Sequence, residues 1–180
     1  EHFHCLSFLG INRNVKREWR TLHRAFGGIG LFSFSVEHTI GMINMLLQHY
    51  GAGTTLARKM AASMEALQLE IGCIGCPFGE NYDELHLLAT ACWTKSLWER
   101  LHYYKFRVHL DFPPLKLPRT RDVPLVRLFR DAGYVGQLLQ DLNRCRLYLK
   151  LLFLSDIATA CGRFLNVSLI SRPPQPHKSV

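Results

Sequence analysis

The chain has 180 residues, of which 48% are hydrophobic, and this is enough to bury one sizeable core. It carries 22 Lys and Arg against 14 Asp and Glu, a formal net charge of +8 with the histidines neutral. This excess favours polyanionic partners, chiefly nucleic acid, and no stretch approaches the roughly 20 apolar residues that span a bilayer, so a membrane protein is not expected.

Apolar residues at helical spacing predict three helices in the first part of the chain. The first helix covers residues 14–23 and ends at the glycines of 27–30. The second helix is capped by Ser35, and its apolar stripe consists of Val36, Ile40, Ile43 and Leu47. The third helix runs from Thr55 to Ile71 and stops at Gly72. Its apolar face consists of Leu56, Met60, Met64, Leu67 and Ile71.

The middle of the chain alternates loops with short helices. Three glycines and a proline predict a loop over residues 72–81, and leucines predict a short helix near 85–88. Thr90 is expected to cap a further helix that carries Trp93, Leu97, Trp98 and Leu101. From Phe106 to Phe112 apolar and polar residues alternate, a period typical of a short strand or an extended segment.

Residues 113–122 form a proline-rich basic loop. After it, Asp122 is expected to cap a helix that ends before Gly133. The longest helix should cover 137–153, and its inward stripe should consist of Leu138, Leu142, Cys145, Leu149 and Leu152. Ser155 is expected to cap a last short helix that stops at Gly162, and residues 172–180 should be disordered.

These elements predict a mainly α fold, an irregular multi-helix bundle with at most one or two short strands. We expect a helical region over residues 1–112, the loop at 113–122, and a C-terminal helical region at 123–171 that packs on the first. The first residues show no charged leader followed by a long apolar run, so we expect an intracellular protein of the nucleus or cytoplasm. Its six cysteines are expected to be free thiols.

Two arginine-rich clusters predict contacts with nucleic-acid phosphates, because arginine suits bidentate phosphate binding. The first cluster consists of Arg13, Lys16, Arg17, Arg20 and Arg24, with Trp19 among them. The second consists of Arg119, Arg121, Arg127, Arg130, Arg144 and Arg146. The alternative is that both are solvated polar faces, with Trp19 buried against the glycine turn.

Four residues are of types that suit zinc, namely Cys73, Cys76, His86 and Cys92. Their spacing matches no zinc module, and small thiols in apolar helical surroundings are ordinary core residues. Gly28 and Gly30 before a helix resemble part of a phosphate-binding loop, but no strand precedes them and the third glycine is missing.

The run Trp19-Arg20-x-Leu22-x4-Gly27-Gly28-Ile29-Gly30-Leu31 resembles the segment that follows the palm of retrotransposon reverse transcriptases. The tryptophan pair at 93–98 and the residues of 142–149, with 154–162 after them, resemble later helices of retroelement proteins. The resemblance implies a thumb-like region that holds template and primer and packs on a palm. Magnesium would be held only by that palm, which lies outside this chain.

The chain departs from reverse transcriptases at the site of catalysis. It contains no adjacent pair of Asp residues, although two-metal phosphoryl transfer needs clustered carboxylates. We therefore expect no catalytic residue and no cofactor in this chain. Two other functions stay open, a helical protein-interaction module without a nucleic-acid role and a small zinc-stabilised domain.

Overall fold

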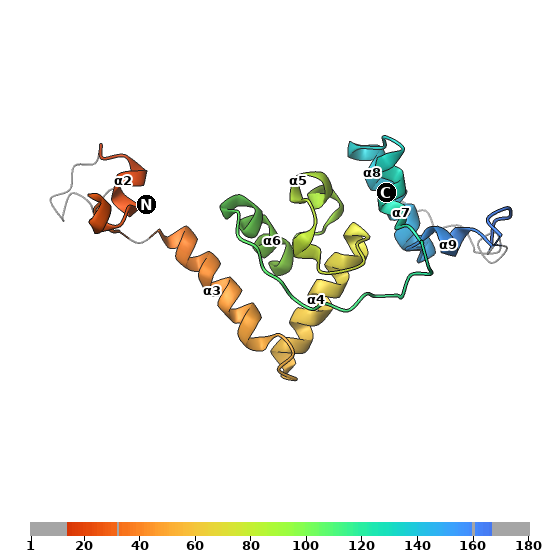
Figure 1. Cartoon of the computed structure of the whole chain (residues 1–180), viewed down its shortest axis with the longest axis horizontal. Helices are drawn as coiled ribbons and strands as arrows, with labels where there is room; N and C mark the ends of the chain where they lie inside the picture. Colours follow the sequence, from red (N-terminus) through yellow and green to blue (C-terminus); the bar gives the residue numbers. More distant parts are fainter. Residues whose placement is uncertain (1–13, 32, 160, 167–180) are drawn as a thin grey trace, which may run out of the picture. The chain divides into compact units, whose positions relative to one another are not determined.

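The computed structural model describes residues 14–31, 33–159 and 161–166 (Figure 1). The described residues are mainly helical and contain no sheet, which confirms the predicted fold class. Their only β-type pairings are two isolated bridges, Pro124 with Phe153 and Ala158 with Leu165. The chain divides into two compact units, residues 1–45 and 46–180. None of the described helices is both long enough and apolar enough to cross a bilayer.

The first unit contains helix α2 (Arg17–Thr21), the 3-10 turn η1 (Arg24–Phe26) and the start of α3 (Phe34–His49). Helix α2 is shorter than the predicted 14–23, because Leu22 takes an extended conformation. The apolar stripe predicted for α3 is wrong, since the buried positions are Thr39, Met42 and Leu46. Ser35 lies inside α3, where its carbonyl oxygen accepts a hydrogen bond from the Thr39 hydroxyl.

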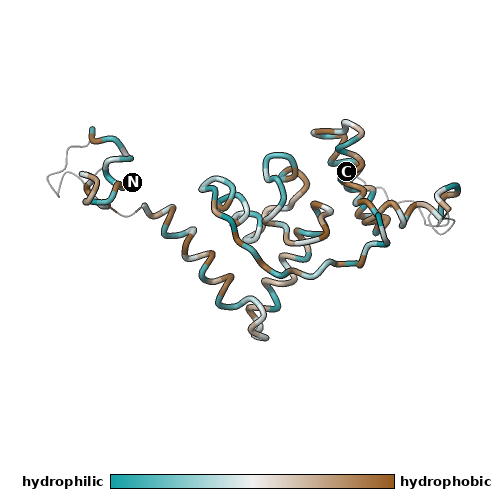
Figure 2. The backbone as a smooth tube through the Cα atoms, in the orientation of Figure 1, coloured by the Kyte–Doolittle hydropathy of each residue, from teal (hydrophilic) through white to brown (hydrophobic). Residues whose placement is uncertain are grey.

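In the second unit, α4 (Thr55–Ile71) has the predicted bounds. The Thr54 hydroxyl accepts a hydrogen bond from the main-chain N–H of Ala57, and Gly72 ends the helix in the left-handed conformation. Polar and apolar bands alternate along α4, as an amphipathic helix requires (Figure 2). The buried positions are Ala57, Met60, Met64, Leu67, Gln68 and Ile71, whereas Leu56 is exposed.

Short helices follow α4 in the order η2 (Pro77–Gly79), α5 (Tyr82–Leu85), η3 (His86–Leu88) and α6 (Trp93–Tyr104). The N-cap of α6 is Cys92, and Thr90 instead binds the carboxylate of Glu70. Of the two alternatives predicted for 106–112, the structure has the extended segment and not the strand, because these residues pair with no neighbouring strand among the described residues. Its buried residue Phe112 packs beside Tyr50 with 6.3 Å between ring centroids.

The last helices are α7 (Leu125–Asp131), α8 (Gly136–Leu149) and α9 (Leu154–Ile157). Pro124, not Asp122, is the N-cap of α7. Lys150 takes the left-handed conformation and ends α8 four residues before the predicted position. Helix α9 begins before Ser155 and ends at Ile157, before the expected Gly162. The tail predicted at 172–180 lies outside the described residues.

The stripe predicted to face inward from α8 is wrong. The helix buries Leu139, Asn143 and Arg146, whereas Leu138 and Cys145 are exposed. Two polar side chains occupy the buried face because they bind carbonyl groups at the end of α4. The main core cluster joins α4, α5, η3, α6, α7 and α8 and consists of Leu67, Ile71, Leu85, Leu88, Ala89, Trp98, Val126 and Leu139.

Candidate nucleic-acid interface

The Trp19–Leu31 segment folds into a closed turn in which the glycine run returns along α2. Three N–H groups of the returning chain donate to carbonyl oxygens of residues 19–22: Ile29 to Trp19 (2.9 Å), Gly30 to Leu22 (3.0 Å) and Leu31 to Arg20 (2.7 Å). The 3-10 turn η1 makes the reversal, and the His23 ring caps it by accepting from the N–H of Ala25. We call residues 19–31 the tryptophan–glycine turn.

Two glycines of this turn are required by its geometry. A Cβ at Gly28 would lie 2.0 Å from the carbonyl oxygen of Leu22, a distance that no side chain can occupy. Gly27 has a φ of +80° and ends η1 in the left-handed conformation that favours glycine. The glycine run therefore has a structural explanation that does not need a bound phosphate.

Aromatic side chains of the turn are exposed. Trp19 is 52% exposed and Phe26 is 74% exposed. The edge of the Trp19 ring lies 3.7 Å from where a Cβ of Gly27 would stand, so the ring rests on the glycine turn without being buried by it. The alternative in which the glycine turn buries Trp19 is therefore wrong, because about half of this side chain is exposed.

The first predicted cluster surrounds this turn. Lys16 and Arg24 are exposed, and the Arg24 Nε donates to the Ile29 carbonyl at 3.4 Å. Arg20 is half-buried, and its Nε donates to the carbonyl of Val15 at 2.7 Å. Arg17 begins α2, and Arg13 lies outside the described residues.

The second predicted cluster does not act as one surface. Arg119 and Arg121 are exposed in the loop at 113–122, and Arg121 has a φ of +63°. Arg144 is exposed on α8 and pairs with Asp141 at 2.9 Å. Arg127 and Arg130 pair with carboxylates of Asp131 and Glu84. Among the exposed arginines of this cluster in the described residues, Arg119 and Arg121 are the two for which no ion pair is seen.

Arg146 was predicted to contact phosphate, and the structure corrects this. The residue is 2% exposed, and its guanidinium donates to the carbonyl oxygens of Leu69, Glu70 and Leu151 and to Oδ1 of Asn143. Burial lowers the pKa of Arg146 to about 10, so the group stays charged at neutral pH. It binds the carbonyl end of α4, where a cation is favourable.

The predicted zinc ligands are not brought together. Within the described ranges, no three His, Cys, Asp or Glu side chains gather as a metal site would require. The Cys73 thiol donates to the Gly75 carbonyl, the Cys92 sulfur lies 3.0 Å from the Thr94 hydroxyl, and His86 Nδ1 lies 3.0 Å from the Tyr82 carbonyl. Cys76 precedes η2 as its N-cap. The cysteines at 73, 76, 92, 145 and 161 form no disulfide.

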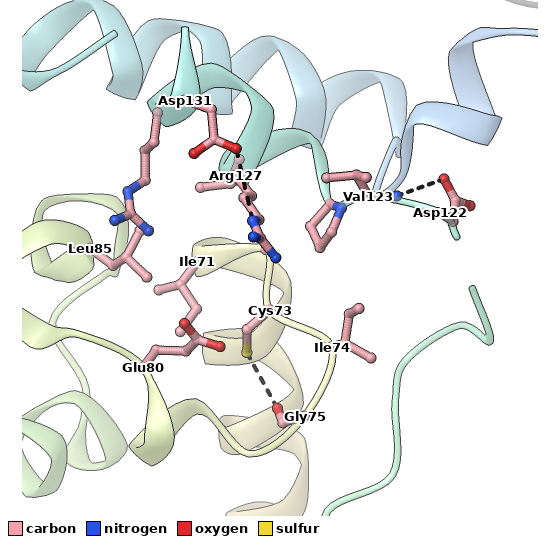
Figure 3. A pocket seen from close by; sticks show the side chains of 14 residues that line it. Ile71, Cys73, Ile74, Gly75, Glu80, Leu85, Asp122, Val123, Arg127 and Asp131 are labelled. Carbon is pink, nitrogen blue, oxygen red and sulfur yellow. Dashed lines mark hydrogen bonds and ion pairs between the residues drawn. The ribbon is translucent and has the colours of Figure 1, made fainter. Parts of the chain in front are cut away.

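A cavity of about 430 Å³ lies between the chain after α4 and the start of α7 (Figure 3). Its lining carries both signs of charge, because it includes the ion pair of Arg127 with Asp131 as well as Glu80. Burial raises the pKa of the Cys73 thiol in its wall, so this sulfur is a protonated and weak nucleophile at neutral pH. We therefore assign no catalytic or binding role to this cavity.

No family model, curated protein or solved structure matches this chain.

Proposed function

We propose that this chain binds the sugar–phosphate backbone of nucleic acid, as a noncatalytic helical portion of a retroelement reverse transcriptase. Its remaining surface would pack on a palm domain outside this chain. The observation that carries the proposal is the pair of exposed loop arginines, Arg119 and Arg121. The resemblance of the tryptophan–glycine turn to the post-palm segment of these enzymes supports it.

No ion pair joins either loop arginine to an acid of the described residues, and the two acids nearest the loop make other contacts. Oδ1 of Asp122 accepts N–H groups of Val123 and Ser155, and Oδ2 accepts the Ser155 hydroxyl. Asp156 pairs with Lys116 and also accepts two main-chain N–H groups. These contacts hold the loop against the start of α9 while two guanidinium groups remain exposed. Such groups suit bidentate contacts with phosphate oxygens.

The tryptophan–glycine turn adds a second basic element. Residues 14–31 contain four Lys and Arg against one acid, Glu18. Lys16 and Arg24 are exposed there. Contacts of this kind hold a nucleic acid without reading its sequence.

A protein-interaction module is the second candidate, and α8 carries the observation that favours it. Val135 and Leu138 are exposed at the start of this helix, with Leu138 53% exposed, and Cys145 is exposed two turns later. The stripe predicted to face inward is therefore partly open to a partner. Nothing in its charges identifies that partner, so this candidate ranks below nucleic-acid binding.

The test compares two double variants of the whole chain. Arg119→Ser with Arg121→Ser removes the loop arginines, and Arg58→Ser with Lys59→Ser removes two exposed basic residues of α4. Both variants lose the same charge. We expect the loop variant to bind a primer–template RNA–DNA duplex more weakly and to lower the salt slope by about 2. Equal effects of the two variants would show attraction by net charge alone and would refute a site at the loop.

A further inference from the structure

We infer that the tryptophan–glycine turn holds unpaired nucleotides, with a base stacked on Trp19 and another on Phe26. The inference rests on the proposed function and names the form of nucleic acid that this part of the chain prefers. It is carried by the two exposed rings, which the packing of the described residues does not explain.

The two rings are exposed for different structural reasons. The edge of the Trp19 ring lies within van der Waals distance of Gly27, and the remainder of the ring is open. Phe26 ends η1 and touches His23 edge-on, with 6.5 Å between ring centroids. A phenylalanine that is 74% exposed adds little core packing, and Phe26 follows the basic residue Arg24 by two positions in sequence. Its place in the turn is explained if it meets a flat apolar ligand.

The positive charge near the two rings favours a ligand that is anionic as well as planar. Arg24 is exposed on this turn and Lys16 is exposed three residues before it, and Glu18 is the one acid among residues 14–31. Nucleotides combine a planar base with a phosphate, and proteins that bind single strands pair stacking rings with basic side chains. In a duplex the bases stack on one another, so exposed rings reach them only in an unpaired segment.

The backbone of the turn is held before any ligand arrives. The three hydrogen bonds from residues 29–31 to residues 19–22 close the turn, and Gly28 lies directly against Leu22. A site whose backbone is already ordered loses less conformational entropy when it binds. The turn is therefore suited to hold a strand, rather than to fold around it.

The test uses the whole chain with Trp19→Leu and, separately, Phe26→Leu. The probes are a single-stranded oligo-uridine of about 12 nucleotides and a blunt RNA–DNA duplex of the same length, a size that matches usual single-strand sites. Tyr103→Leu is the matched control, because Tyr103 of α6 is 73% exposed and lies outside the turn. Circular dichroism checks that each variant is folded.

We expect each turn variant to lose about tenfold in affinity for the single strand, while its duplex affinity and salt slope stay those of the control. Oligo-uridine should also quench tryptophan fluorescence in the wild-type chain and fail to do so in Trp19→Leu. An equal loss for both probes, or none for either, overturns the inference and leaves backbone binding standing. A wild-type chain that binds neither probe overturns the inference and the proposed function together.

Discussion

The Cα of Gly28 lies so close to Leu22 that a Cβ at position 28 would stand 2.0 Å from the Leu22 carbonyl oxygen. That carbonyl also accepts the N–H of Gly30 at 3.0 Å, so it cannot move aside without breaking the turn. The contact explains why a glycine run follows the tryptophan helix.

We therefore expect Gly28→Ala to open the tryptophan–glycine turn, at a cost of about 1–3 kcal/mol. Hydrogen exchange at the amides of Ile29 and Leu31 would measure the opening. Gly41→Ala is the control, since Gly41 lies within α3 and a Cβ there meets no atom within 4 Å. Unchanged protection at both amides in Gly28→Ala would show that the turn tolerates a side chain.

Gly72 presents a second close approach, where the end of α4 meets α7. Gly72 has a φ of +70°, and its missing Cβ would lie 2.5 Å from Cγ2 of Val126. Gly133 has a φ of +85° with open space around it. Substituting it therefore measures the cost of backbone strain alone, without the cost of crowding. We expect Gly133→Ala to cost about 1 kcal/mol in urea unfolding, and Gly72→Ala to cost about 1–3 kcal/mol more.

A second substitution checks the cause of that difference. Val126→Ala should recover part of the stability lost by Gly72→Ala, because it removes the methyl group that the new side chain meets. If the two substitutions are simply additive, crowding by Val126 is not the reason for the glycine.

Arg146 joins α8 to the end of α4, and its loss should be costly. Arg146→Met leaves the carbonyl oxygens of Leu69 and Glu70 without this donor in a buried place, which we expect to cost about 3 kcal/mol. Arg144→Met removes an exposed arginine two positions away and should change the free energy of unfolding by less than about 1 kcal/mol. Similar losses in the two variants would contradict the structural role of Arg146.

Helices α4 and α8 show how much of the fold could be predicted from the sequence. The bounds of α4 were predicted from its apolar spacing and from Gly72, and the structure confirms them. The buried face of α8 could not be predicted in this way. Asn143 and Arg146 are polar, and they are buried because carbonyl groups 73–77 residues earlier in the chain need donors. A hydropathy pattern contains no information on such distant partners.

The candidate interface could also be predicted only in part. Clusters of basic residues are visible in the sequence, and Lys16, Arg24, Arg119 and Arg121 are exposed. The sequence does not show which basic residues form ion pairs. In the structure Arg127 and Arg130 pair with acids, and this distinguishes them from Arg119 and Arg121. The exposed Phe26 was missed, although its position between a basic residue and the glycine run was the available signal.

Acid should loosen the loop at 113–122 from α9. For Asp122 and Asp156, burial acts to raise the pKa, but hydrogen bonds prevail and lower both pKa values below the ordinary 3.8. These bonds come from Ser155 to Asp122, and from Lys116 and main-chain N–H groups to Asp156. The stabilisation is therefore complete above the ordinary pKa and is lost as the pH falls through the lower values of the folded state.

Unfolding free energies measured from roughly pH 6 to pH 2 would check this. The variant with Asp122→Asn and Asp156→Asn should be less stable than the wild-type chain at neutral pH, and the difference should shrink as the pH falls. A difference that stays constant across this range would show that the two carboxylates do not contribute through their ionised forms.

The salt dependence of binding tests the central claim most directly. The affinity of the whole chain for a primer–template RNA–DNA duplex would be measured between about 50 and 200 mM salt. If Lys16, Arg24, Arg119 and Arg121 each neutralise a phosphate, the logarithm of the affinity falls linearly with that of salt concentration, with a slope of about −3 to −4. A folded chain that binds without salt dependence, or does not bind, contradicts backbone binding and leaves the exposed face of α8 as the better guide to function.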